Sequence, residues 1–201
     1  MELSSTSLSL IQRVRDGDDV AWSELARLYG PLVYTWCRTR SIDANDSADI
    51  LQAVLLSVHR SIHQFRLGEK GTSFRGWLFG LTRNKIGDHF RVLQKRQDQA
   101  VGGGLEPTLA AVMKPPSFED DVEQVQRDRQ FLLLQAAKQI QSQLSDEDWA
   151  IFTQTVIDGR SAPEVSRDLG LSAVAVRQRK SRVVRRLRMQ FEGIEDFFDD
   201  V

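Results

Sequence analysis

The sequence contains a single cysteine and no apolar run as long as a membrane-spanning helix. Cys37 alone cannot form an internal disulfide bond or a cysteine metal site, so we expect a buried thiol without a redox role. A membrane-spanning helix needs about 20 apolar residues. The N-terminal residues also lack the basic start and apolar centre of a signal peptide. These absences predict a globular, cytoplasmic protein with no membrane insertion.

The chain also has little net charge, only −1 over 201 residues, but its charges are unevenly distributed. Segments 60–96 and 160–188 each contain nine basic and two acidic residues. Between Arg177 and Arg188 there are seven basic residues and no acidic one. A polyanion that bound this chain would be attracted to these two basic segments.

No segment alternates apolar and polar residues as a β-strand does, and the apolar residues recur at helical spacing. Residues 97–121 contain three successive glycines and three prolines without a sustained helical period, which is typical of a linker. The predicted fold class is therefore all-α, with two small helical domains joined by a flexible linker. The domains are expected over 5–96 and 122–192, followed by an acidic tail over 193–201.

Helices are predicted throughout the N-terminal domain. The first long helix is capped by Asp18 or Asp19, and we expect it to end at Gly30-Pro31 because proline interrupts helical hydrogen bonding. A second apolar stripe covers residues 50–65, and a third begins at Phe74 and continues towards residue 93.

Local signals in the C-terminal domain predict a helix-turn-helix. Ser161 and Glu164 form a capping box, and Gly170 provides the positive φ that ends the short helix. Ser172 then caps the second helix. The apolar residues of this second helix share one face, formed by Val176, Val183, Leu187 and Phe191.

The remaining faces of this second helix are basic, a geometry that fits the major groove of DNA. Near its N-terminus, Arg177 can pair with guanine and Gln178 with adenine. The predicted DNA contacts of the helix are Arg177, Gln178, Ser181, Arg182, Arg185 and Arg186. The alternative is a solvated helix end, where basic residues favour the C-terminal dipole.

Motifs in both domains resemble the extracytoplasmic-function (ECF) class of bacterial sigma factors. DSADILQAV (46–54) is similar to that family's D-x-x-D-L-x-Q motif, which implies that Asp49 and Gln52 bind core RNA polymerase. FRGWLFGLTRNKIGDHFR (74–91) is similar to the segment that recognises and melts the promoter element nearest the start site. EVSRDLGLSAVAVRQRKSRVVRRLR (164–188) resembles the helix-turn-helix that reads the upstream element.

The central block has the chemistry that such a role implies, because binding single-stranded DNA needs aromatic platforms beside cations. The loop over 66–73 contains two glycines and is expected to fold around an extruded base. The predicted contacts with the proximal element and the melted strand are Phe74, Arg75, Trp77, Arg83, Asn84, Lys85 and Arg91. For Phe74 and Trp77 the alternative is a place in the core, and Asp88 is expected to organise Arg91.

The resemblance implies that the chain directs core polymerase to promoter DNA and helps to melt it. No cofactor is expected and the chain is not expected to be an enzyme, since the chemistry belongs to the polymerase. An anti-sigma factor or another regulatory protein is a further candidate partner. Two alternatives are a helix-turn-helix regulator and a sigma-like mimic acting through protein–protein interaction. A metal site would rest on His59 and His63 with Asp46 and Asp49, and it lacks a third close ligand.

Overall fold

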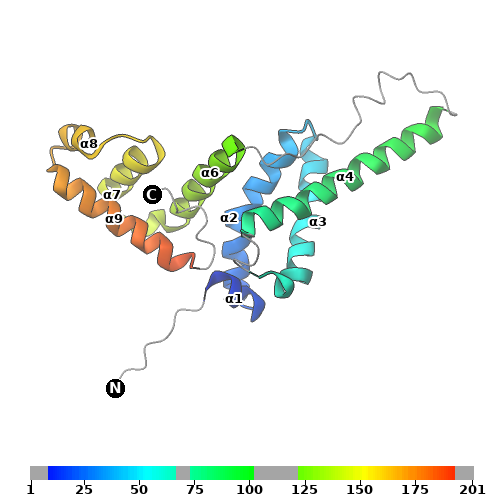
Figure 1. Ribbon diagram of the computed structural model, residues 1–201, viewed down its shortest axis with the longest axis horizontal. Coiled ribbons are helices and arrows are strands. Elements are labelled where there is room, and N and C mark those ends of the chain that lie inside the picture. Colours follow the sequence, from blue (N-terminus) through cyan, green and yellow to red (C-terminus); the bar gives the residue numbers. More distant parts are fainter. Residues whose placement is uncertain (1–8, 67–72, 102–121, 193–201) are drawn as a thin grey trace. The chain divides into compact units, whose positions relative to one another are not determined.

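The computed structural model describes residues 9–66, 73–101 and 122–192, and its helices are labelled in Figure 1. The predicted all-α class is confirmed, because the described residues form helices and no strand. The described residues group into two compact units, one from residues 9–28 and 122–192 and the other from residues 29–66 and 73–101. The predicted acidic tail, the loop at 67–72 and most of the predicted linker lie outside the described residues.

Two helices begin the chain, α1 (Leu10–Arg15) and α2 (Asp19–Arg38). The predicted cap is confirmed, since the Asp18 carboxylate accepts hydrogen bonds from the Val20 and Ala21 amides at 2.9 and 3.0 Å. The prediction that this helix ends at Gly30-Pro31 is wrong, because α2 continues through Pro31 to Arg38.

Packing explains how α2 tolerates this proline. Pro31 removes one helical hydrogen bond at a cost of about 3 kcal/mol, but its ring is exposed and causes no crowding in the core. The helix buries apolar side chains on both sides of that position. The buried residues nearest to Pro31 are Leu28, Tyr29, Leu32, Val33, Trp36 and Cys37. Burial also raises the pKa of the Cys37 thiol to about 11, as expected for an unreactive core cysteine.

The second unit is built on two long helices that pack against each other, α3 (Ala44–Ser61) and α4 (Phe74–Val101). The short 3₁₀ helix η1 (Ile62–Gln64) follows α3 directly. The predicted apolar stripe is confirmed, with buried residues at helical spacing along α3 and beyond its end. They are Ile50, Val54, Val58, Ile62 and Phe65. Helix α4 continues past residue 97, where the linker was expected to begin.

The C-terminal helices start with α6 (Val122–Ile140), followed by the 3₁₀ helix η3 (Gln141–Gln143) and α7 (Asp146–Phe152). The π-helical turn η4 (Thr153–Ile157) extends α7. Two further helices, α8 (Ala162–Leu169) and α9 (Ala173–Gln190), complete this part of the fold. Helix α9 packs against α6, α7 and α8.

The local signals that predicted the helix-turn-helix are confirmed. Ser161 and Glu164 form the capping box, and hydrogen bonds from the Ser161 hydroxyl and amide lower the pKa of the Glu164 carboxyl. Gly170 has φ +66° and ends α8. The Ser172 side chain accepts a hydrogen bond from the Ala175 amide at 3.1 Å, which caps α9. These contacts fix where α9 begins relative to α8.

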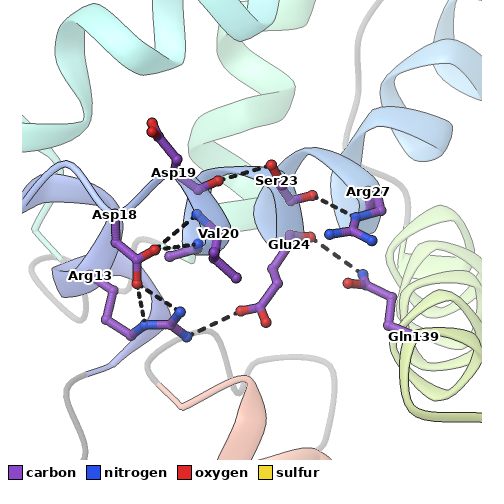
Figure 2. A network of polar contacts seen from close by, with 9 residues as sticks. Arg13, Asp18, Asp19, Val20, Ser23, Glu24, Arg27 and Gln139 are labelled. Atoms are coloured by element: carbon purple, nitrogen blue, oxygen red, sulfur yellow. Dashed lines mark hydrogen bonds and ion pairs between the residues drawn. The ribbon is translucent and has the colours of Figure 1, made fainter.

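Figure 2 shows a polar network that ties α1 to α2 and α2 to α6 within the first unit. The Arg13 guanidinium pairs with Asp18 at 2.8 Å and with Glu24 at 3.1 Å. The Gln139 side-chain amide donates to the Glu24 carbonyl at 3.3 Å. Helix α1 and the start of α2 up to Leu28 therefore group with the C-terminal helices, whereas they were predicted to form one domain with the residues up to 96. The predicted domain boundaries stay a prediction.

Candidate nucleic-acid interface

Helix α9 presents its basic side chains on the faces opposite its buried face. The predicted apolar residues are confirmed as buried, and Val184, which was not among them, is buried as well. All six side chains predicted to contact DNA are exposed. The structure therefore brings the predicted residues together on one accessible helix surface, formed by Arg177, Gln178, Ser181, Arg182, Arg185 and Arg186.

The cations of α9 differ in what they contact. Arg179 forms ion pairs with Glu147 and Asp148 in the first turn of α7. Arg186 donates hydrogen bonds to the side chain and the carbonyl of Gln143 in η3. With the residues that the structure describes, three exposed arginines make neither a hydrogen bond nor an ion pair: Arg177, Arg182 and Arg185. Their charge is available to an external anion.

Two shallow grooves run along the exposed surface of α9, with volumes of about 480 and 410 Å³. Arg177, Ser181 and Arg185 line both grooves. Lys180 is half-buried and lines the first groove beside Val184. Because the walls combine cations with a hydroxyl group, both grooves suit phosphate and base-edge oxygens.

The predicted contacts on α4 divide into exposed and buried side chains. Arg83, Asn84 and Arg91 are exposed, and Lys85 is half-buried. Arg91 forms the expected ion pair with Asp88 at 2.8 Å. Asn84 and Arg91 are seven residues apart and share one face of α4, whereas Lys85 lines the groove beside α3.

Phe74 lies in the core, which was the alternative for this residue, and none of its surface is exposed. Its ring packs edge-on against Tyr29 at 4.8 Å and against Phe65 at 5.3 Å between centroids. Trp77 is half-buried and contacts Phe65 at 5.2 Å, so part of its ring is accessible. Of the two predicted aromatic contacts, Trp77 alone has an accessible ring surface to offer to a base.

Arg75 is buried as well, with 4% of its surface exposed. Its guanidinium lies 5.5 Å from the Trp36 ring centroid and 5.2 Å from that of Phe79. Such contacts between a cation and ring faces are stabilising, especially away from water. The structure therefore does not place Arg75 on the accessible surface of α4 with Arg83.

The residues predicted to bind polymerase, Asp49 and Gln52, are exposed on α3. Asp49 lines a groove of about 380 Å³ between α3 and α4, and Lys85 lines the same groove from α4. Asp49 was predicted to bind polymerase and Lys85 to bind DNA, so the two were expected on separate surfaces. It also missed His89, whose Nε2 lies 3.7 Å from the Asp46 carboxylate across this groove.

The histidines considered as metal ligands, His59 and His63, are exposed. Across residues 9–66, 73–101 and 122–192, no three His, Cys, Asp or Glu side chains are grouped as metal ligands would be. The same residues include no helix long and apolar enough to cross a membrane.

Comparison with known proteins gives two family matches in the order that the fold suggests. The model of sigma-70 region 2 matches residues 25–96, and that of sigma-70 region 4 matches residues 142–189. The chain belongs to the ECF sigma factor family.

Relatives extend over most of this sigma factor. It is 26% identical over 179 residues to the RNA polymerase sigma factor NccH of Alcaligenes xylosoxydans xylosoxydans, covering 89% of this chain and 90% of NccH. It is 25% identical over 186 residues to the ECF RNA polymerase sigma factor SigD of Mycobacterium tuberculosis, covering 90% and 82%. It is 26% identical over 184 residues to the ECF RNA polymerase sigma factor BldN of Streptomyces coelicolor, covering 92% and 65%.

The two family matches coincide with the two candidate surfaces. Helices α3 and α4 lie in the region 2 match, apart from the last turn of α4. Helix α8, the turn at Gly170 and all of α9 except Gln190 lie in the region 4 match. As an ECF-type sigma factor, the chain is a transcription initiation factor for RNA polymerase. Core RNA polymerase and promoter DNA are the partners that this family implies.

Proposed function

We propose that this sigma factor recognises the upstream promoter element through α9 and the proximal element through α4. The observation that carries the proposal is the group of three exposed arginines on the second helix of a helix-turn-helix, each without a partner among the described residues. Basic side chains in this position neutralise DNA phosphates, while those near the helix N-terminus reach base edges.

Base reading on α9 belongs to Arg177 and Gln178, which are exposed within its first turns. Arg177 can donate two hydrogen bonds to guanine, and the amide of Gln178 can pair with adenine. Arg182 and Arg185 lie one and two turns further along, so they contact phosphates and set the register. Arg186 is held by its hydrogen bonds with Gln143 and helps to fix α9 on its scaffold.

The surface of α4 binds the proximal element and the melted strand. Arg83, Lys85 and Arg91 provide cations for the backbone, and Asn84 can both donate and accept hydrogen bonds to a base. The accessible part of Trp77 provides the stacking surface. Phe74 and Arg75 support this surface from the core, so their contribution is to the shape of α4.

Core RNA polymerase binds α3 through Asp49 and Gln52, in accordance with the D-x-x-D-L-x-Q motif. The sigma factor works in the cytoplasm, where its polymerase is, and performs no catalysis of its own. An anti-sigma factor or another regulatory protein that covered α3 would prevent polymerase binding, which makes this helix the expected target of such a regulator.

Polymerase binding is tested with the double variant Asp49→Ala/Gln52→Ala in a pull-down with purified core enzyme. We expect at least about tenfold weaker binding, because a carboxylate and an amide are removed from one contact surface. The control is His59→Ala/His63→Ala, which changes two other exposed side chains of the same region and should bind normally. Equal binding by the first variant and the wild type, with equal helical circular dichroism, would refute the assignment to α3.

Function as a whole is tested by transcription in vitro with core enzyme and a library of promoters. The full chain should start transcription from a subset of the library that shares an upstream and a proximal sequence. A helix-turn-helix regulator would instead bind DNA without core enzyme and would not start transcription. A sigma-like mimic would act through protein–protein interaction without binding DNA, and it would start no transcription.

A further inference from the structure

Val174 is an exposed apolar side chain in the first turn of α9, with 54% of its surface accessible. The other three valines of this helix, Val176, Val183 and Val184, are at most 6% exposed. Val174 therefore takes no part in the core that holds α9 in place. Valine is also a poorer helix former than alanine, since its branched side chain loses rotational freedom. Folding alone gives no reason for valine at this position.

Val174 lies beside the two predicted base-reading residues of the helix-turn-helix. It precedes Arg177 by three residues and Gln178 by four, so the three side chains lie on the same face of α9. All three are exposed. In this motif the N-terminal residues of the second helix are those that meet base edges in the major groove. Val174 is thus closer to the helix N-terminus than either predicted base-reading residue.

An apolar side chain such as valine matches one chemical group in the major groove. Valine can neither donate nor accept a hydrogen bond, and the apolar group that unmodified bases present in this groove is the C5 methyl of thymine. In a helix, valine strongly prefers one χ1 rotamer, which holds its two methyl groups in a fixed place. The neighbouring Ala173 and Ala175 are shorter and half-buried, so they present less apolar surface.

We propose that Val174 reads the 5-methyl group of a thymine in the upstream promoter element, beside the bases read by Arg177 and Gln178. The proposal rests on the proposed function of α9 and adds a specificity-determining residue to it.

The test compares thymine with uracil in the DNA, because uracil keeps the base pairing and lacks only the methyl group. Holoenzyme is assembled from the full chain and core polymerase, and a bound promoter is selected from a random duplex library. Each thymine of the upstream element is then replaced singly by deoxyuridine. For the wild type we expect one replacement to weaken binding about three- to tenfold, the effect of losing one buried methyl contact.

The Val174→Ala holoenzyme should bind the original promoter more weakly by a similar factor and show no further loss with uracil at that position. Met189→Ala is the matched control, because Met189 is an apolar residue with 70% exposure near the opposite end of α9. It should keep the full response to uracil. Equal binding of scrambled duplexes by all three proteins shows that the variants remain folded.

Two results would overturn the role of Val174 while leaving the proposed function intact. In the first, no replacement of thymine by deoxyuridine in the selected upstream element weakens binding, or the selected element contains no thymine. In the second, Val174→Ala remains as sensitive to uracil as the wild type, so another residue contacts the methyl. A holoenzyme that selects no sequence at all would refute the proposed function itself.

Discussion

Replacing Arg75 by alanine distinguishes a place in the core from a place at the DNA surface. The sequence predicts that Arg75 contacts DNA, because it stands in a basic segment beside aromatic residues. In the structure it is 4% exposed, and its guanidinium packs over the rings of Trp36 and Phe79. A core residue that is truncated lowers stability, whereas a surface contact that is removed lowers affinity for DNA.

The expected loss of stability follows from the two ring contacts. A desolvated contact between a guanidinium and an aromatic face contributes up to about 2 kcal/mol, and the arginine stem adds packing that alanine loses. With guanidinium-to-centroid distances of 5.5 and 5.2 Å, we expect Arg75→Ala to reduce the free energy of unfolding by about 3–4 kcal/mol. This is a large share of the 5–15 kcal/mol that is typical of a domain.

Urea unfolding followed by tryptophan fluorescence measures this loss, since Trp36 reports directly on the site. Arg83→Ala is the control, because Arg83 is exposed on the same helix and its removal should change stability by less than about 0.5 kcal/mol. Arg83→Ala should instead weaken binding of melted promoter DNA. If Arg75→Ala has the same urea midpoint of unfolding as the wild type and loses salt-dependent binding to DNA, then Arg75 contacts DNA and the inference from its burial is wrong.

Three other substitutions test the helix-turn-helix. Gly170→Ala should lower stability by about 1–2 kcal/mol in thermal unfolding, because φ +66° disfavours a side chain although the space around it is open. Glu164→Gln keeps the capping geometry and should remove the part of the pH dependence of stability that comes from Glu164. The pKa of Glu164 is lowered in the folded state, so its contribution to the free energy of unfolding is fully present above the ordinary glutamate pKa of roughly 4.3. This contribution is lost as the pH falls through the lowered pKa. Urea unfolding at pH 7 and pH 3 should therefore differ less for this variant than for the wild type. Arg182→Ala should weaken binding to all duplexes alike and reduce the slope of log affinity against log salt by about one; a loss confined to one sequence would show base reading instead.

Local interactions explain which parts of the fold were predictable. The caps at Ser161 and Ser172 and the turn at Gly170 depend on contacts within four residues, so the sequence displays them directly. Pro31 shows the limit of such rules. The local rule ends a helix at proline, whereas the buried side chains before and after Pro31 favour a continuous α2, and this packing depends on residues far away in the sequence.

The same distinction applies to the candidate site. The exposed face of α9 follows from helical periodicity, and all six predicted residues lie on its surface. The burial of Arg75 depends on Trp36, which lies in a different helix, and no local pattern connects the two. The hydrogen bonds of Arg186 with Gln143 likewise join residues 43 positions apart. Sequence patterns predict which side chains share a face, and tertiary contacts decide which of them are free to bind.

The cations of α9 therefore serve two purposes, although the sequence presents them as one run of charge. Arg179 pairs with acidic side chains at the start of α7, and Arg186 bonds to Gln143, so both hold α9 on its scaffold. A helix held in this way loses less conformational freedom when DNA binds, which favours affinity. The salt dependence of binding to duplex DNA should consequently reflect Arg182 and Arg185, the two arginines without a described partner that contact phosphates, with a slope of log affinity against log salt of about −1.8, at about −0.9 for each phosphate. The seven basic residues between Arg177 and Arg188 would give a slope more than twice as steep if all of them contacted phosphates.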